Sequence, residues 1–342
     1  MRTISIDMTL TLDRNHWNIN RLPIDTPAFD VDAYVNRLPS VHDFDLRTKL
    51  QEWKESGIVR FESCVDDDMI EKLLEDILYL SENRSRFDLE IEFRGTRLPL
   101  KEMTSSPLSD TGVKFNCLEN LSLAARELSL NRLICEFLGH VFLDAPVVLQ
   151  SLTFWRGSEQ PVHIDYPYVR TQTRLPHLAA SWIPLENIHP DAGPLAYYPG
   201  SHRHELITPF DWGDGSIVFE PDSVRSPAEF SAYLYSEISR LGLQRQVFLP
   251  QRGDVLIWHG NLLHEGTHVE DPSRTRRSYI THYTSLASYP REHMLPDAMR
   301  TAAFTRKHGG YVFEHPWVRD ERELPSWKQG STSRMNASLR VP

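Results

Sequence analysis

The second half of the chain contains a series of short apolar segments, each with the composition of a β-strand and each bounded by turns rich in Gly, Pro or Asp. These segments cover residues 147–155, 178–185, 194–198, 255–259 and 276–283. Short strands at such spacing are typical of a β-sandwich or a closed barrel. Because strands and helices do not alternate here, the pattern argues against a parallel α/β sheet. We therefore expect a β-strand core that begins at about residue 146.

The first half of the chain has mainly helical patterns. Leu46, Leu50 and Trp53 recur at helical spacing before Gly57, and an acidic first turn opens a second helix at 66–80. Further elements expected here are a strand at 58–61, one or two strands within 84–116, and helices at 122–128 and 131–138, the last one closed by Gly139. The fold expected is mainly β with flanking helices, an α+β protein with a helical N-terminal part.

These patterns divide the chain into three parts. Residues 1–45 carry scattered Pro, Asn and Asp and are interpreted as an N-terminal arm. Residues 46–290 form the body, and 291–342 are a C-terminal extension. Within the body, 205–247 is interpreted as an insertion that is rich in aromatic residues and contains a helix at 228–241. Its composition suggests a lid over the core.

Charge and cysteine content limit the class of protein. A net charge of −10 argues against non-specific nucleic-acid binding, which requires a basic surface. The N-terminus lacks the apolar core of a signal peptide, and no apolar run reaches the length of a membrane span. Cys64, Cys117 and Cys135 are odd in number and form no CxxC pair, which favours free thiols over structural zinc. We expect a cytoplasmic protein without a membrane or nucleic-acid partner.

The tripeptide His163-Ile164-Asp165 follows the strand-like segment 147–155 and the turn after it. On extended backbone, residues i and i+2 point to the same side, so an imidazole and a carboxylate lie next to each other. They are two thirds of the 2-His-1-carboxylate triad that binds non-heme Fe(II) and leaves positions open. A short motif of this kind also occurs by chance, so the third ligand decides its meaning.

Eight downstream histidines are candidates for the third ligand: His177, His189, His202, His204, His259, His264, His268 and His282. His264 is preferred because it follows an apolar pair on a strand and precedes Glu265-Gly266, where a small residue leaves room for a metal. His259 is the rival, although five residues of straight strand would turn its side chain to the other face. The sequence therefore predicts a metal site formed by His163, Asp165 and His264, with His259 structural.

Several motifs, taken together, resemble the phytanoyl-CoA dioxygenase family. They are His163-Ile164-Asp165, Trp182-Ile183-Pro184-Leu185, Pro199-Gly200-Ser201-His202-Arg203, Gly253-Asp254, His264-Glu265-Gly266, and Arg276 to Tyr283. The resemblance covers roughly residues 45–290. It implies a double-stranded β-helix, which is a jelly-roll barrel, and an oxygenase that depends on Fe(II) and on 2-oxoglutarate as cosubstrate.

Carried over residue by residue, the resemblance implies a role for six positions: His163, Asp165 and His264 as iron ligands, Arg276 at the distal carboxylate of 2-oxoglutarate, and Trp182 and Gln150 near the cosubstrate. A guanidinium suits the carboxylate because it can donate two parallel hydrogen bonds. The implied partners are a small-molecule substrate and molecular oxygen. The implied reaction oxidises a C–H bond and releases succinate and CO2, and the carboxylate of Asp165 favours hydroxylation over halogenation.

Two other classes of function compete with the oxygenase. A catalytically silent jelly roll would keep the fold and a metal as a binding module, but the survival of all ligands together with Arg276 argues against it. A zinc hydrolase could use the same two histidines and aspartate. It would leave the Pro199-Gly200-Ser201-His202 turn and Arg276 without a function.

One position departs from the pattern of the resembled family. Several relatives have Ser two residues after the distal histidine, whereas this chain has Gly266. We expect another hydroxyl, of Thr281 or of a tyrosine, to replace it at the distal carboxylate.

The substrate is less well indicated than the cosubstrate. Tyr166, Tyr168, Arg170 and Arg174 follow Asp165 closely and are predicted to line the mouth of the site. Aromatic rings with two arginines suit a substrate that carries a carboxylate, a phosphate or a sugar. Ordinary loop residues would give the same pattern.

Overall fold

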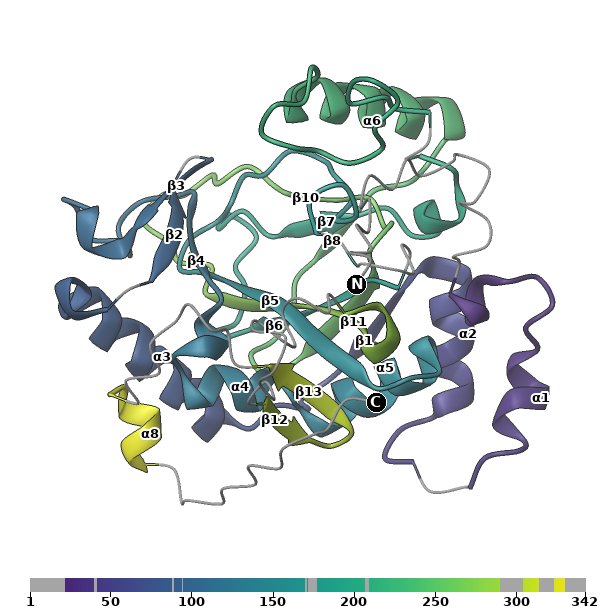
Figure 1. Ribbon diagram of the computed structural model, residues 1–342, viewed down its shortest axis with the longest axis horizontal. Helices are drawn as coiled ribbons and strands as arrows, with labels where there is room; N and C mark the ends of the chain where they lie inside the picture. Colours follow the sequence, from purple (N-terminus) through teal and green to yellow (C-terminus); the bar gives the residue numbers. More distant parts are fainter. Residues whose placement is uncertain are drawn as a thin grey trace, which may run out of the picture.

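The computed structural model describes residues 22–39, 42–87, 89–93, 95–169, 171, 177–206, 209–289, 304–313 and 323–329. In this part of the chain, a ten-stranded sheet and a three-stranded sheet form the centre of the molecule (Figure 1). Helices pack on one face of the large sheet, and the small sheet lies on the other.

The large sheet has the strand order β1-β9-β6-β11-β5-β4-β2-β3, and β13 joins it beside β5 and pairs with β12. Its strands are β1 (Ile58–Phe61), β2 (Glu90–Phe93), β3 (Thr96–Pro99), β4 (Val113–Asn116), β5 (Pro146–Phe154), β6 (Ala179–Pro184), β9 (Val255–His259), β11 (Ser278–Ser285), β12 (Phe304–Lys307) and β13 (Gly310–Phe313). The small sheet has the order β10-β7-β8, with β7 (Leu195–Tyr197), β8 (Gln246–Phe248) and β10 (His264–Gly266). The strands expected at 58–61 and in the second half are thus confirmed, whereas the region 84–116 holds three strands and not the one or two expected.

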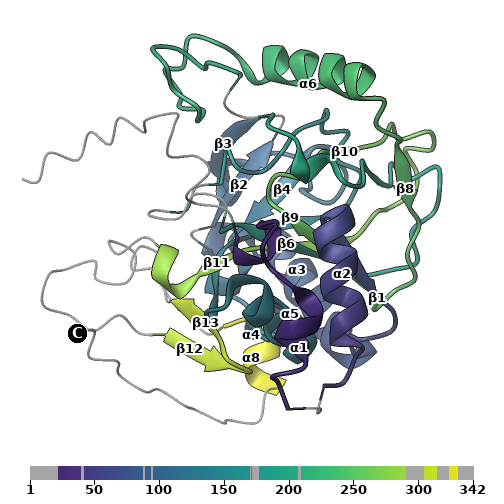
Figure 2. The ribbon, with the colours of Figure 1, turned by 90° about the vertical axis from the view of Figure 1, so that its right-hand side faces the viewer.

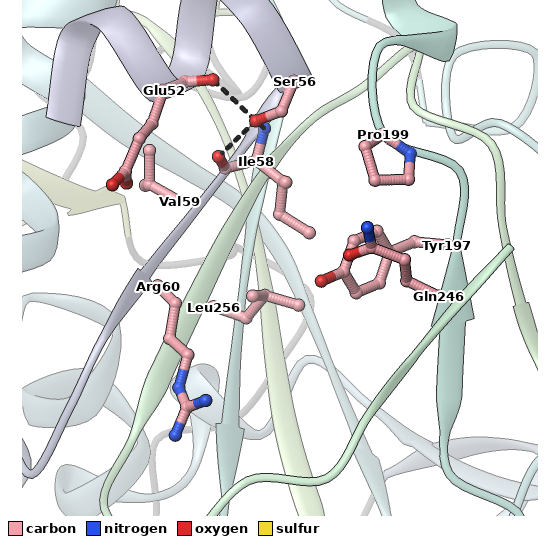
Figure 3. Close-up of a pocket in the computed structure, with 9 residues that line it drawn as sticks. All are labelled: Glu52, Ser56, Ile58, Val59, Arg60, Tyr197, Pro199, Gln246 and Leu256. Atoms are coloured by element: carbon pink, nitrogen blue, oxygen red, sulfur yellow. Dashed lines mark hydrogen bonds between the residues drawn. The ribbon is translucent and has the colours of Figure 1, made fainter. Parts of the chain in front are cut away.

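The two sheets face each other across an apolar core, and the strands of the described residues do not close into a barrel. Trp182, Phe248 and Trp258 belong to this core, which draws residues from both sheets. A shallow hollow of about 270 Å³ lies where the edge strands β1 and β8 stand apart. Figure 3 shows it, with Ile58 on one side and Gln246 on the other. The sequence pattern allowed a sandwich or a closed barrel, and the structure has the open form.

The helices of the first half are α2 (Leu46–Ser56), α3 (Asp67–Glu82), α4 (Leu123–Ser129) and α5 (Arg132–Phe142), as expected from their periodicity. Gly57 ends α2 in the left-handed conformation, with φ of 73°. Gly139, expected to end α5, instead lies inside it, and Leu143 takes the left-handed cap position with φ of 51°. A helix tolerates one glycine at a cost of about 1 kcal/mol, so the buried apolar face of α5 carries the helix past it.

The remaining helices lie at the periphery. They are α1 (Val31–Val35), α6 (Pro227–Leu241) and α8 (Pro325–Gln329), with 3-10 turns η2 (Pro23–Asp25), η3 (Arg84–Arg86), η4 (Leu100–Glu102), η5 (Leu118–Asn120), η6 (Ser201–Arg203) and η7 (Leu286–Ser288). Helix α6 is the helix expected in the insertion, and it lies across the top of the molecule in both views (Figures 1 and 2). A capping box formed by Ser226 and Glu229 starts it, and Gly242 ends it.

Strand β11 separates a helix-facing side from a side that faces the small sheet. The hydroxyls of Tyr279 and Thr281 lie 2.7 and 3.1 Å from the hydroxyl of Ser129 in α4. Because strand residues alternate, the even-numbered side chains of this region face the interior between the sheets, as Ile280 does within the apolar core. Arg276 and His282 follow the same alternation.

All three cysteines are free, as expected. Burial raises the pKa of the Cys64 and Cys135 thiols to about 12, so these side chains are poor nucleophiles at neutral pH. In the part of the chain that the structure describes, no helix combines the length and the apolar character that a membrane span requires.

Candidate metal centre

His163, Asp165 and His264 converge in the interior between the sheets. One ligand atom from each lies within 4.8 Å of the other two, and all three residues are buried. The Asp165 Oδ1 atom lies 3.9 Å from His163 Nε2 and 3.4 Å from His264 Nε2. The two backbones are joined directly, since His163 and His264 exchange N–H···O hydrogen bonds of 2.9 and 3.0 Å. This isolated bridge extends the small sheet beyond β10 and fixes the spacing of the two imidazoles.

Backbone carbonyls orient both imidazoles in the same way. His163 Nδ1 lies 2.9 Å from the carbonyl oxygen of Pro161, and His264 Nδ1 lies 2.9 Å from that of Leu262. A carbonyl only accepts, so each Nδ1 carries the proton and each Nε2 presents a lone pair to the centre. The side-chain nitrogen of Gln160, 3.1 Å from His163 Nε2, is placed to donate to that lone pair.

The carboxylate of Asp165 is fixed by an indole. Trp258 Nε1 donates to its Oδ2 atom at 2.8 Å, which leaves Oδ1 facing the imidazoles. Burial alone would raise the pKa of Asp165, but the nearby imidazoles of His264 and His282 hold it well below its usual range. Burial and the neighbouring His264 lower the pKa of His163 to about 3. A charged carboxylate beside a neutral imidazole is the protonation state that metal binding requires, so this donor set fits a divalent metal.

His259 lies on the strand next to this centre but takes part in a different network. Its Nε2 atom lies 3.1 Å from Asp25 Oδ2, and its Nδ1 accepts from the backbone N–H of Asn261 at 2.9 Å. Both ring nitrogens are therefore bonded within the protein. The His259–Asp25 contact therefore holds the 3-10 turn η2 against β9.

Arg276 is buried in the same interior and is 2% exposed. Its guanidinium lies over the rings of Phe154 and Trp182, 5.4 and 5.8 Å from their centroids. Its Nε atom has no hydrogen-bond partner among the described residues, and burial lowers the pKa of the group to about 10. A buried guanidinium without a counter-ion is costly, so the site is suited to an anion. Arg277 points outward instead and pairs with Glu186 at 2.6 Å.

His282 is a component of the site that the sequence analysis considered only as a possible third ligand. It is 3% exposed, and its Nε2 atom lies 3.5 Å from Asp165 Oδ1. Gln150, predicted near the cosubstrate, lies opposite it on β5, with Nε2 3.5 Å from His282 Nδ1. The alternation that places Arg276 inward also predicts an inward His282, six residues further along.

The residues predicted to line the mouth of the site differ in position. Tyr168 lies edge-on to His163, with ring centroids 6.4 Å apart, and contacts Trp212 and Phe219 of the insertion. Tyr166 is fully buried in the apolar cluster below the insertion. Arg170 and Arg174 lie outside the described residues.

The insertion is attached to the strand that carries His264. Glu265, the next residue, points away from the centre and accepts hydrogen bonds from Tyr235 of α6 at 2.7 Å and from Arg245 at 2.6 Å. Tyr198 donates to the same carboxylate at 3.4 Å. Tyr166, Trp212 and Phe230 pack together in the apolar cluster under α6. The insertion thus covers the outer side of the segment that carries the centre.

The prediction that the Thr281 hydroxyl takes the place of the hydroxyl absent at Gly266 is wrong. That side chain faces α4 on the opposite side of β11, because Thr281 is odd-numbered in the alternation. Tyr279 and Tyr283 face the same way, with hydroxyls bonded to the backbone of Ala125 and Ser129. A Cβ atom at Gly266 would overlap the hydroxyl of Ser158 and would lie 3.0 Å from the backbone nitrogen of Glu159.

Gly266→Ser should therefore lower the free energy of unfolding by about 1–3 kcal/mol, as overpacking of a filled site does. Adding Ser158→Ala should recover part of this loss, because it removes the atom that the new Cβ meets. Urea unfolding of both single variants and the double variant measures the coupling. A Gly266→Ser protein as stable as the parent would show that Ser158 does not fill this space.

Comparison with known proteins identifies relatives of this chain. The family model of phytanoyl-CoA dioxygenase (PhyH) matches residues 53–278. A phytanoyl-CoA dioxygenase of Arabidopsis thaliana is 28% identical over 141 residues, which cover 40% of this chain and 44% of that relative. The alignment thus spans less than half of the curated relative's length.

Solved structures share the fold at low sequence identity. EctD from S. alaskensis with bound Fe has a TM-score of 0.54 and 16% identity, covering 90% of each chain. The epimerase SnoN in complex with Fe3+, alpha ketoglutarate and nogalamycin RO has a TM-score of 0.53 and 15% identity, covering 79% of this chain and 98% of SnoN. These structures support the predicted double-stranded β-helix architecture, here with two open sheets. Because the family model covers most of the body, from residue 53 to residue 278, the chain belongs to the phytanoyl-CoA dioxygenase family.

Proposed function

We propose that this protein is a dioxygenase dependent on Fe(II) and 2-oxoglutarate, with His163, Asp165 and His264 as the iron ligands. The observation that carries the proposal is a buried 2-His-1-carboxylate cluster in the same interior as a buried guanidinium whose Nε has no hydrogen-bond partner among the described residues. Family membership supports it, as do the neighbours EctD and SnoN, which were solved with iron or alpha ketoglutarate. Two imidazoles and one carboxylate are the donor set of non-heme Fe(II) oxygenases.

When bound, iron and 2-oxoglutarate would supply the oxidation of a substrate C–H bond, with release of succinate and CO2. The residues of the chain fix the geometry. The carbonyls of Pro161 and Leu262 hold the Nδ1 protons of the two histidines, and Trp258 holds one oxygen of Asp165. Hydrogen bonds of this kind orient the metal ligands, and their loss typically weakens metal binding by about 10–100-fold. The presence of Asp165 favours hydroxylation over halogenation, because a carboxylate takes the position that a halide would need.

Arg276 is the proposed binding group for the distal carboxylate of 2-oxoglutarate. Its fork of donors can bind a carboxylate bidentately, and burial between Phe154 and Trp182 strengthens that attraction. Trp182 contributes a wall of this subsite. Gln150 contacts His282, which in turn lies beside Asp165, so its proposed place is beside the metal end of the cosubstrate.

The proposed substrate is a small molecule, with molecular oxygen as the second partner. Tyr168 supports this, because it joins the metal centre to the aromatic residues of the insertion. The insertion would then act as a cover that excludes water from the reacting groups. Its attachment through Glu265 links the cover to the strand that carries His264. Three free thiols fit a reducing compartment, and we propose a cytoplasmic location.

The experiment that tests the proposed function is succinate release from 2-oxoglutarate by the Fe(II)-loaded protein in air. Oxygen- and iron-dependent succinate formation is expected in the parent protein and in the surface variant Arg277→Lys. It should be lost in Asp165→Ala, which removes the only carboxylate of the cluster. Iron binding without succinate would favour the silent jelly roll. Hydrolytic activity that needs zinc but neither oxygen nor 2-oxoglutarate would favour the zinc hydrolase.

A further inference from the structure

A second group of metal-ligating side chains lies outside the centre described above. His42, Glu136 and His140 each offer one ligand atom within 4.8 Å of the other two. None of these residues belongs to the interior between the sheets. Glu136 and His140 lie on α5, and His42 belongs to the segment that precedes α2.

The local fold determines this arrangement. Glu136 and His140 are four residues apart on α5, so their side chains lie on the same face of the helix, one turn apart. His42 is brought to this face by its neighbour Phe44, whose ring packs against Phe61 and Phe137 at centroid distances of 5.2 and 6.3 Å. The group therefore joins the N-terminal segment to the body of the protein.

The two histidines have different hydrogen-bond partners. His140 Nδ1 lies 2.9 Å from the hydroxyl of Tyr34, which leaves its Nε2 for another partner. His42 Nδ1 lies 2.7 Å from Glu136 Oε1, and its Nε2 is a buried atom with no hydrogen-bond partner among the described residues. The rings of His42 and His140 are 5.3 Å apart in a T-shaped arrangement. A hydroxyl bonded to the second nitrogen of an imidazole is a common support of a metal ligand.

The side chains of His42 and Glu136 remain 17% and 25% exposed, so an ion can reach them from solvent. Hydrogen bonding alone leaves one nitrogen of His42 unsatisfied, whereas a cation would use the lone pairs that the cluster presents.

We propose that His42, Glu136 and His140 form a second divalent-cation site, separate from the iron centre. Two imidazoles and one carboxylate suit a borderline ion such as Zn²⁺, with water completing the coordination. The bound ion would fasten the segment before α2 to α5. Its role is structural, because the ligands come from the outer side of the helical layer and none of them faces the interior between the sheets.

The test is zinc binding to the apo protein, measured by competition with a chromophoric chelator. The His264→Ala background removes a ligand of the iron centre, so that zinc bound there does not obscure the result. One equivalent of zinc is expected in His264→Ala and none in His264→Ala combined with Glu136→Gln. Zinc should raise the melting temperature of the first protein and leave that of the second unchanged.

A matched control is available at another surface pair. His268 lies 2.6 Å from Glu159, and this His–Glu contact has no second histidine in a metal-ligating group among the described residues. His268→Ala in the His264→Ala background should keep the full equivalent of zinc. Because glutamine has nearly the same shape as glutamate, circular dichroism should show that His264→Ala is folded with and without Glu136→Gln. The proposal is overturned if the His264→Ala protein binds no zinc. It is also overturned if adding Glu136→Gln to that protein leaves the zinc binding unchanged.

Discussion

His264→Ala is expected to abolish bound iron and turnover, whereas His259→Ala should retain measurable iron. The Nδ1 atom of His264 donates to a backbone carbonyl, so its Nε2 lone pair faces the centre beside Asp165 and is available to a metal. In His259 both ring nitrogens are already bonded, to Asp25 and to the backbone of Asn261. The measurement is iron per chain, by colorimetric assay, after anaerobic loading and removal of excess metal.

The two variants form a matched pair, since each removes one buried imidazole. His259→Ala should cost about 1–3 kcal/mol of stability, because Asp25 loses its partner, and the iron content should be compared well below the melting temperature. Equal loss of iron in both variants, or loss in His259→Ala alone, would mean that the third ligand has been assigned to the wrong histidine.

Arg276→Lys is expected to weaken 2-oxoglutarate binding by about 1–3 kcal/mol, which corresponds to roughly 5- to 150-fold in affinity. Lysine keeps the positive charge but loses the planar fork, and its compact ammonium cannot make two parallel hydrogen bonds to one carboxylate. The effect should be large because Arg276 is buried and its Nε has no bonded partner among the described residues. Titration of the oxygen-free, iron-loaded protein, followed by its absorbance, measures the affinity.

Arg277→Lys is the internal control, because the adjacent side chain points outward to Glu186. A surface substitution of this kind should change the affinity little. If Arg277→Lys weakens binding and Arg276→Lys does not, the cosubstrate approaches from the other face of the strand. If neither variant matters, 2-oxoglutarate is held elsewhere, and the proposed function loses its second support.

Local patterns were sufficient to predict most of the elements that build the site. Apolar runs bounded by turns predicted β5, β6, β7, β9 and β11, because a buried strand needs a continuous apolar side and a turn at each end. The i, i+2 spacing of His163 and Asp165 likewise predicted two side chains on one side. Their approach to His264 depended on a contact between segments far apart in the sequence, and the local signals for it were the apolar pair before His264 and the small Gly266 after it.

The errors have identifiable causes. Gly139 was expected to end α5, but the apolar face of the helix continues to Phe142, and tertiary packing outweighs the preference of one residue. Thr281 was assigned to the interior, but strand alternation turns it to the side opposite Arg276. Its hydroxyl therefore faces α4. His282 was considered only as a possible third ligand, although an inward Arg276 implies by strand alternation that His282 also points inward.

The extension at the C-terminus has a consequence for where the chain could be cut. Ser326 of α8 donates its backbone N–H and its hydroxyl to the buried carboxylate of Asp76 in α3, at 2.9 and 2.5 Å. Ser122 provides a third hydrogen bond, and burial raises the pKa of this acid. Truncation at residue 290 would remove two of these three donors and leave an acid in the interior with one. Although the sequence pattern changes near residue 290, the shortened protein would lack hydrogen bonds that its own core requires, because α8 is bonded to α3.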